Sequence, residues 1–346
     1  MPKLVFQYPS KFPLECGESL PSFQLTYHTY GSLNAQKDNV IWVMHALTAN
    51  SDAADWWEGL FGEGRLLDPK KYFIICANML GSCYGSTYAL SENPLTGRPY
   101  FHDFPLLTNL DMVKAFDLLR ESLGISQISL GLGGSMGGQQ LLEWAIFRPE
   151  IFHQLAPIAT NARHSPWGIA FNEAQRMAIL ADASWKEDRP DAGLDGMRAA
   201  RATALLSYRS YETYGRTQED PNPTNGQLEK YRASTYQQYQ GEKLARRFDA
   251  FAYWTLSQAM DAHDLGRGRG SREAALATIQ AQTTCISIHS DVLFPPVEQR
   301  FLADHIPNAS YEIVESMYGH DGFLIETEAL NRILGEKREV GGERVL

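Results

Sequence analysis

The amino-acid sequence predicts an α/β protein in which a mainly parallel sheet is covered by helices and carries an inserted helical lid. Apolar runs of strand length alternate with helical patterns through the first half of the chain, which is typical of a covered parallel sheet. From about residue 162 to 270 the strand pattern is replaced by Ala, Arg, Gln, Glu and Tyr in helix-compatible order. Strand patterns then return. We therefore expect a core in two parts, 1–161 and 271–346, with the lid 162–270 between them.

Strands are expected where apolar runs lie between turn signals. These runs are LVF (4–6), FQLTY (23–27), VIWVM (40–44), YFIICAN (72–78), ISLGLG (128–133), TTCISIHS (283–290) and SYEIVES (310–316). The later runs lack a clean polar alternation, as expected of strands that are buried on both faces.

Helices are expected between these strands. In 108–124 apolar residues recur on one face, and Gly124 ends the pattern. That face carries Met112, Ala115, Phe116, Leu118 and Leu119. A final helix is expected near 322–334. The segment PNPTNGQ at 221–227 should form a turn-rich interruption of the lid, and the tail KREVGGERVL at 337–346 should fray.

The composition is that of an ordinary globular chain of 346 residues, with 44% hydrophobic and 21% charged residues. The formal net charge of -10 disfavours nucleic-acid binding, which depends on Lys and Arg that neutralise phosphates. The start MPKLVFQYPS lacks the apolar core of a signal peptide, and no apolar run reaches the length of a membrane span. We therefore expect a cytoplasmic protein that binds small molecules and neither nucleic acid nor a membrane.

The four cysteines contain no CxxC pair, so neither a zinc site nor a disulfide framework is expected. Cys76 and Cys285 lie in apolar runs and should belong to the core. Cys83 lies in LGSCYGS without the His-Cys motif of a thiol hydrolase, which favours an inert thiol. No metal and no bound cofactor are predicted.

The most specific motif is Gly133-Gly134-Ser135-Met136-Gly137, a GxSxG sequence between the strand pattern ISLGLG and the helical pattern QQLLEWAIFRP. A serine at such a strand-turn-helix junction adopts a strained backbone conformation that lifts its hydroxyl above the sheet. Only small neighbours permit that turn. A phosphate-binding loop does not fit, because the chain has no GxxxxGK[ST]. We therefore predict an α/β-hydrolase fold with Ser135 as its nucleophile.

A serine hydroxyl needs a base that is oriented by a carboxylate, and in this fold the chain order is Ser, acid, His. Of nine histidines, His320 fits best, since it follows the last strand pattern in a Gly-bracketed turn. His289 should be packed within a strand, and His45 precedes the serine. Asp291 directly follows a strand pattern and is the predicted acid, whereas the neighbour of the base, Asp321, should point elsewhere.

Negative charge that develops on the carbonyl oxygen requires two backbone N–H donors. Met136, the residue after the nucleophile, supplies one. The second should come from the loop His45-Ala46-Leu47-Thr48-Ala49-Asn50, which follows the VIWVM run, and we assign it to Leu47.

With these residues and further motifs, nearly the whole chain resembles the homoserine O-acetyltransferase family. The matching segments are His45 to Thr48, Asn78 to Thr87, Asn93-Pro94 with Thr96-Gly97, Gly133 to Gly138, Leu142 to Ala145, Phe171 to Glu173, Tyr239 to Gly241, Arg247 to Asp249, Ser290 to Phe294 and Gly319 to Leu324. The resemblance implies the same triad and oxyanion donors. It also implies acetyl transfer from acetyl-CoA, a co-substrate, to L-homoserine in methionine biosynthesis, through a double displacement at Ser135, by a homodimer that associates through the lid.

The resemblance further implies substrate contacts that composition and spacing do not locate. Arg201 would bind the amino-acid carboxylate with Tyr208 beside it, and Asp321 would bind the ammonium. Arg198 and Arg209 are close to Arg201 in sequence and look no different, so a solvated helix face is the alternative for Arg201.

The chain departs from the family pattern at two places. Ala49 stands where the family usually has Gly, and Thr108-Asn109-Leu110-Asp111 replaces Thr-Ile-Arg-Asp, so an arginine is missing at position 110. An O-succinyltransferase or a serine O-acyltransferase of the same family is the first alternative function, and a serine esterase or hydrolase with the same triad is the second. A non-catalytic binding protein would have been expected to lose a member of the triad.

Overall fold

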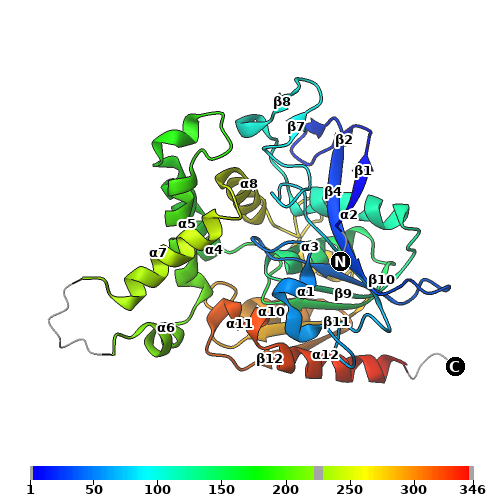
Figure 1. Ribbon diagram of the computed structural model, residues 1–346. Helices are drawn as coiled ribbons and strands as arrows, with labels where there is room; N and C mark the ends of the chain where they lie inside the picture. Colours follow the sequence, from blue (N-terminus) through cyan, green and yellow to red (C-terminus); the bar gives the residue numbers. More distant parts are fainter. Residues whose placement is uncertain (1–2, 222–228, 343–346) are drawn as a thin grey trace.

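The computed structural model describes residues 3–221 and 229–342 and places an eight-stranded sheet at the centre of the molecule (Figure 1). The strand order is β1-β4-β6-β5-β9-β10-β11-β12. The β1–β4 and β4–β6 pairs are antiparallel, and the remaining pairs of the sheet are parallel. The strands are β1 (Leu4–Tyr8), β4 (Phe23–Tyr30), β5 (Val40–Met44), β6 (Phe73–Ala77), β9 (Ile128–Gly134), β10 (Phe152–Ile158), β11 (Gln282–Ile288) and β12 (Ala309–Val314). The predicted mainly parallel sheet is confirmed.

Both faces of the sheet are covered, because successive side chains of its central strands enter two different cores. In β5, Val40, Trp42 and Met44 belong to one core, and Ile41 and Val43 belong to the other. The first core also contains side chains of α2 (Asn109–Ser122), α3 (Met136–Phe147) and α10 (Pro296–His305). The second contains side chains of α1 (Ala53–Trp56), η1 (Glu58–Leu60), α11 (Gly322–Ile325) and α12 (Thr327–Gly342).

Between β10 and β11 the chain leaves the sheet and forms the helices drawn in green and yellow in Figure 1. They are α4 (Pro166–Leu180), η3 (Ala183–Lys186), α5 (Leu194–Tyr208), α6 (Tyr211–Gln218), α7 (Arg232–Ala245), α8 (Ala250–Asp261) and α9 (Arg272–Leu276). The two ends of this insertion meet, since the Leu265 N–H donates to the Ala162 carbonyl over 2.9 Å and the His164 N–H donates to the His263 carbonyl over 3.0 Å. The predicted helices are present, whereas the role of the insertion as a lid stays a prediction.

Most predicted elements have their expected places, but several elements were not predicted. The run 40–44 is β5, and the pattern 108–124 contains α2, which Thr108 caps. The unpredicted elements include β10 and α10. β10 carries His153, Gln154 and Pro157 and therefore does not read as an apolar strand, yet it pairs with β9 and β11 in the middle of the sheet. Outside the sheet, two short hairpins join β2 (Phe12–Pro13) to β3 (Ser19–Leu20) and β7 (Glu92–Asn93) to β8 (Arg98–Pro99).

The carboxyl end of the chain differs from its prediction. The expected helix 322–334 is divided into α11 and α12, and the backbone of α12 continues to Gly342. The predicted fraying from residue 337 is therefore wrong for 337–342, and residues 343–346 lie outside the described residues. The turn-rich segment predicted at 221–227 also lies outside them, apart from Pro221. No helix in the described part of the chain is both long and apolar enough to cross a membrane.

Candidate active site

Ser135 forms the turn between β9 and α3, and its backbone lies at φ 58° and ψ -127°. An L-residue at positive φ is strained, so the surroundings must hold it there. The Ser135 N–H donates to the Ile158 carbonyl over 3.0 Å, and the Ser135 carbonyl accepts from the Thr160 hydroxyl at 2.8 Å. The strand-turn-helix geometry predicted from GxSxG is therefore present, with the serine at the start of α3.

The glycines around Ser135 are needed because neighbouring atoms fill the space of a side chain. A Cβ on Gly133 would lie 2.5 Å from the Gly137 carbonyl oxygen, and a Cβ on Gly134 would lie 2.5 Å from the Phe323 ring. A Cβ on Gly137 would collide with the Met44 carbonyl oxygen at the end of β5. Close packing of β5, β9 and α3 thus explains why the turn contains glycine at these positions.

Asp291 follows the carboxyl end of β11 and His320 follows that of β12, and the two side chains meet although they are 29 positions apart in the sequence. The distance between His320 Nδ1 and Asp291 Oδ2 is 2.7 Å, and both residues are 3% exposed. The other oxygen of Asp291 accepts the backbone N–H groups of Leu293 and Phe294 at 2.8 and 2.9 Å. A carboxylate held by three hydrogen bonds can fix the orientation of the imidazole.

His289, the alternative to His320 as the catalytic base, does not lie with the predicted site residues. His289 follows β11 directly, but its side chain is 63% exposed and lies 3.8 Å from Glu315. The expectation that it would be packed within the strand is wrong, because β11 ends at Ile288 and the chain turns outward there.

A pocket of about 400 Å³ brings the predicted site residues together, a size that suits small ligands. Ser135, Leu47 and His320 line it, and so do Arg201, Tyr208 and Asp321. Of all eight residues predicted for the site, only Met136 and Asp291 do not line this pocket. Met136 follows Ser135 as the first residue of α3, and Asp291 is hydrogen-bonded to His320.

Hydrogen bonds of the buried His45 side chain hold the loop that follows β5. The Met79 N–H donates to His45 Nε2 over 3.2 Å, so Nδ1 carries the proton and donates to the Ala46 carbonyl at 2.9 Å. Complete burial lowers the pKa of His45 to about 4, which keeps the ring neutral. The structure thus gives His45 a loop-supporting position instead of a position in the pocket.

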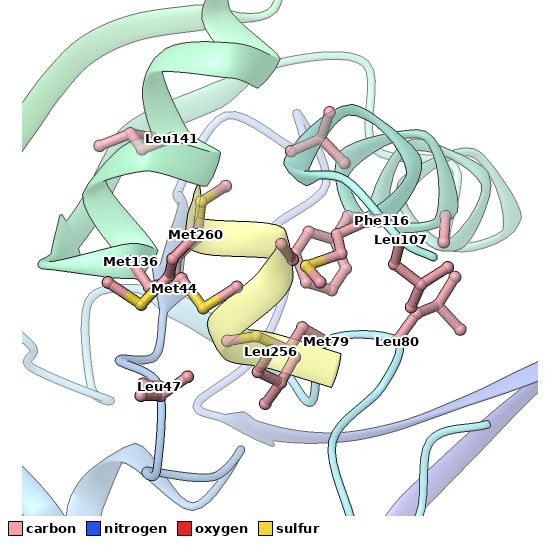
Figure 2. Close-up of a cluster of buried hydrophobic side chains, with 14 of the residues drawn as sticks. Met44, Leu47, Met79, Leu80, Leu107, Phe116, Met136, Leu141, Leu256 and Met260 are labelled. Atoms are coloured by element: carbon pink, nitrogen blue, oxygen red, sulfur yellow. The ribbon is translucent and has the colours of Figure 1, made fainter. Parts of the chain in front are cut away.

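The side chains of the two predicted oxyanion donors point into the protein. Figure 2 shows Leu47 and Met136 in a cluster of buried side chains with Met44 of β5 and with Leu256 and Met260 of α8. Such packing fixes the backbone on both sides of the pocket, which a pre-organised pair of N–H donors requires.

Arg201 differs from its arginine neighbours in its partners. Arg198 forms ion pairs with Asp195 and with Glu242, the latter at 2.7 Å, and Arg209 Nε lies 2.9 Å from Asp321 Oδ2. Within residues 3–221 and 229–342, Arg201 has no hydrogen-bond or ion-pair partner, and its buried Nε is unsatisfied.

The guanidinium of Arg201 instead lies 5.2 Å from the centre of the Tyr208 ring, which itself lies 5.8 Å from the His320 ring. Burial raises the pKa of the Tyr208 hydroxyl, so this group stays protonated near neutral pH. The pocket therefore combines a cation without an acidic partner, a neutral phenol and the carboxylate of Asp321.

The two departures from the family pattern have simple positions. Ala49 lines the pocket, and its N–H closes a turn onto the Ala46 carbonyl at 3.0 Å. Leu110 is partly buried against the first core, next to the capping box that Thr108 and Asp111 form at the start of α2. A leucine at position 110 thus contributes packing where an arginine would contribute charge.

Sequence reasoning did not single out other residues of the pocket wall, among them Asp55, Trp56, Lys243 and Arg247. Arg247 lies within one of the matching segments, which is the only signal that could have identified it. The buried Cys76 and Cys285 agree with the core positions predicted for them. Burial raises the pKa of the Cys83 thiol to about 12, in line with the predicted inert thiol.

Comparison with known proteins identifies the family. The model of the alpha/beta hydrolase fold matches residues 39–327. A homoserine O-acetyltransferase of Cyclobacterium marinum is 48% identical over 334 residues, which cover 96% of this chain and 94% of that protein. The crystal structure of a homoserine O-acetyltransferase from Bacillus anthracis has a similar fold, with a TM-score of 0.88, 24% identity and coverage of 97% and 96% of the two chains.

The acetyl esterase MekB is also similar, with a TM-score of 0.84, 29% identity and coverage of 97% of this chain and 96% of that chain. The α/β-hydrolase fold predicted from the GxSxG motif is confirmed, and so is the family suggested by the resemblance. With a full-length relative at 48% identity, this chain belongs to the homoserine O-acetyltransferase family of the α/β-hydrolase fold.

Proposed function

We propose that this protein is a homoserine O-acetyltransferase, which moves the acetyl group of acetyl-CoA to the hydroxyl of L-homoserine in methionine biosynthesis. The observation that carries the proposal is the unpaired cation of Arg201 in the same pocket as Ser135 and His320. An amino-acid acceptor brings a carboxylate, and a guanidinium without an acidic partner suits it. The full-length similarity to proteins of that name supports the same substrate.

In the first half-reaction His320 accepts the proton of Ser135, and the Ser135 oxygen attacks the thioester carbonyl. Because Nδ1 of His320 is hydrogen-bonded to Asp291, Nε2 of His320 is the atom that accepts this proton. The backbone N–H groups of Leu47 and Met136 stabilise the oxyanion. The thiol of CoA leaves with the proton from His320, and the acetyl group remains on Ser135.

In the second half-reaction the homoserine hydroxyl loses its proton to His320 and attacks the acetyl carbonyl of the acyl-enzyme. Arg201 and Tyr208 hold the carboxylate of the amino acid, and Asp321 holds its ammonium. Asp321 already shares one oxygen with Arg209 at 2.9 Å, an ion pair that fixes the carboxylate before the ammonium binds. The bond between Ser135 Oγ and the acetyl carbon then breaks, His320 returns the proton to Ser135, and O-acetylhomoserine leaves.

The insertion 162–270 serves in this proposal as a lid that limits access of water to the acyl-enzyme. We also propose a homodimer that associates through this lid, and a cytoplasmic location. Large exposed apolar side chains on α4 and α5 of the lid support the dimer, because such side chains are common at protein interfaces. Trp167, Met177, Leu180 and Leu206 are each more than half exposed.

A serine esterase is the second candidate, because water could replace homoserine at the acyl-enzyme without any change in the triad. The similarity to the acetyl esterase MekB favours this reading. The test is to supply purified protein with acetyl-CoA or succinyl-CoA, with homoserine, serine or no acceptor, and to follow free CoA thiol and the acylated amino acid. Thiol release that needs no acceptor and yields no O-acetylhomoserine would identify an esterase.

A further inference from the structure

The end of α7 carries three cations that are close together in sequence. Lys243 lies in the last turn of the helix, Arg246 is the C-cap residue, and Arg247 follows in the turn after it. We call these three residues the basic rim. They belong to the insertion and lie where α7 ends and the chain turns toward α8.

The charges of the basic rim are poorly compensated. Lys243 has no ion-pair or hydrogen-bond partner among the residues that the structure describes. Arg246 lies 3.6 Å from Glu242, but Glu242 is closer to Arg198, at 2.7 Å. Arg247 donates to two neutral oxygens, the Thr48 carbonyl and the Tyr84 hydroxyl. Cations near a helix end favour the helix dipole, but this effect does not require them to line a cavity.

The basic rim lies at the boundary between the active-site pocket and a second, open hollow. Lys243 and Arg247 line the pocket that contains Ser135. Arg246 and Arg247 line the adjoining hollow of about 550 Å³, together with Tyr88 and Phe248. Arg247 belongs to both linings, so a long ligand with one end at Ser135 that extended toward the hollow would pass these three cations.

The acidic residues near this route do not neutralise the cations on the α7 side of the opening. Asp191, which lines the hollow, is paired with Arg189 at 2.8 Å. Asp249 is half-buried and caps α8 through the Ala252 N–H at 2.8 Å. Asp55 lines the pocket as well, but it belongs to α1 in the core and not to the insertion. A polyanion would therefore follow the α7 side of the opening.

We propose that the basic rim binds the phosphate groups of the acyl-CoA donor while its thioester reaches Ser135. The inference rests on the proposed function and adds a donor subsite to it. A chain of net charge -10 repels a polyanion as a whole, so a local positive site is required to attract and hold the donor. Guanidinium groups also match phosphate oxygens with paired hydrogen bonds.

The experiment compares two acetyl donors, acetyl-CoA and the acetyl thioester of N-acetylcysteamine, which has the same reactive group and no phosphate. The double variant Lys243→Glu with Arg246→Glu reverses two charges that make no contact with the oxyanion loop. We expect kcat/KM for acetyl-CoA to fall by about tenfold or more, mainly through KM, and kcat/KM for the truncated donor to stay within about twofold. Lys71→Glu, an exposed charge reversal just before β6 at the opposite end of the strands, is the matched control.

Adenosine 3′,5′-bisphosphate, which carries phosphates but no thioester, provides a second measurement. It should inhibit the wild-type protein competitively against acetyl-CoA and should inhibit the double variant much less. Equal losses with both donors, or no loss with either, would overturn the assignment of the basic rim. If the wild-type protein hydrolyses both donors but acetylates no amino acid, the proposed function fails. The proposal for the basic rim can still be tested in that case, because the double variant should then hydrolyse acetyl-CoA more slowly relative to the truncated donor than the wild type does.

Discussion

Arg247 Nη1 donates a hydrogen bond to the Thr48 carbonyl oxygen over 2.7 Å. This contact joins the insertion to the loop that follows β5, which provides the Leu47 N–H proposed for the oxyanion hole. The loop is thus held from two directions, by His45 on its inner side and by Arg247 on its outer side. The position of the proposed oxyanion donor therefore depends on a residue of the insertion.

Replacement of Arg247 by Ala should release the loop and lower kcat with both the complete and the truncated acetyl donor. A misplaced donor weakens oxyanion stabilisation, so a loss of about ten- to a hundredfold is expected. Arg246→Ala, measured with the truncated donor, is the matched control, because its side chain belongs to the basic rim but does not contact the loop. A normal kcat of Arg247→Ala with the truncated donor would contradict the positioning role.

Ser135→Ala should abolish formation of the acyl-enzyme. Incubation of the wild-type protein with acetyl-CoA alone, at low temperature, should add one acetyl group to the peptide that carries Ser135, as detected by mass spectrometry. The variant should lack this label, and its turnover should fall by up to about a millionfold, as when a nucleophile that acts within a triad is removed. Near-normal turnover by the alanine variant would disprove the triad.

Asp291→Asn and His320→Ala should not have independent effects. Their side chains are 2.7 Å apart and are proposed to act on one proton transfer. The double variant should therefore lose much less activity than the product of the two single losses, because residues that act as a unit are strongly non-additive. Turnover of the four proteins completes the cycle, and multiplicative losses would mean that one of the two residues is only structural.

Arg201→Ala should impair the second half-reaction and spare the first. Loss of a charge-assisted hydrogen bond of about 1.5–3 kcal/mol predicts a ten- to hundredfold lower kcat/KM for homoserine. Arg201→Lys should recover only part of the loss, since an ammonium cannot reproduce the guanidinium fork. The acylation burst and the homoserine-dependent rate are measured separately. Arg198→Ala, whose side chain is already paired with Glu242, is the control.

A slower burst in Arg201→Ala, with an unchanged dependence on homoserine, would move Arg201 to the donor side. In that case the acceptor site would have to be sought elsewhere in the insertion. Slow hydrolysis of the acyl-enzyme should persist in both Arg201 variants and become the main fate of the acetyl group.

Acid should destabilise the fold through histidines that are buried in the neutral form. Burial lowers the pKa of His45 and His164 to about 4 and that of His263 to about 3. An unfolded histidine titrates at a pKa of about 6.5. From about pH 6.5 down to pH 4 the unfolded chain binds protons that the folded chain does not bind. The free energy of unfolding should therefore fall with pH in this window, by up to about 1.4 kcal/mol per pH unit for each histidine.

Urea unfolding curves at a series of pH values measure this slope. His263→Gln should be less stable than the wild type at neutral pH, because His263 Nε2 donates to the Asn161 carbonyl at 3.0 Å and its ring is fully buried. The same variant should show a shallower decline below pH 6.5, since one buried titrating group is gone. His289→Gln, which removes an exposed histidine, is the matched control variant. A wild-type-like slope in His263→Gln would refute the assignment.

Local patterns predicted much of this structure, and tertiary contacts explain the parts that they did not predict. β5 matches its predicted limits because a short unbroken apolar run between polar turns is typical of a buried strand. β10 was missed because Pro157 and His153 are unusual in a strand with two neighbours. Ser135, Asp291 and His320 could be named from motif and chain order. Arg201 could not be distinguished from Arg198 in this way, since the difference is an acidic partner on another helix.

The junction at which Leu265 donates to Ala162 has a consequence for how such proteins diversify. About a hundred residues depart from and return to the same point, so changes of length or sequence within them do not stretch the sheet, and extra chain adds little closure entropy. The proposed catalytic residues Ser135, Asp291 and His320 all lie outside this insertion, whereas Arg201 and Tyr208 lie inside it. Exchange of the inserted helices is therefore a route by which evolution could change the acceptor molecule and keep the acyl chemistry intact.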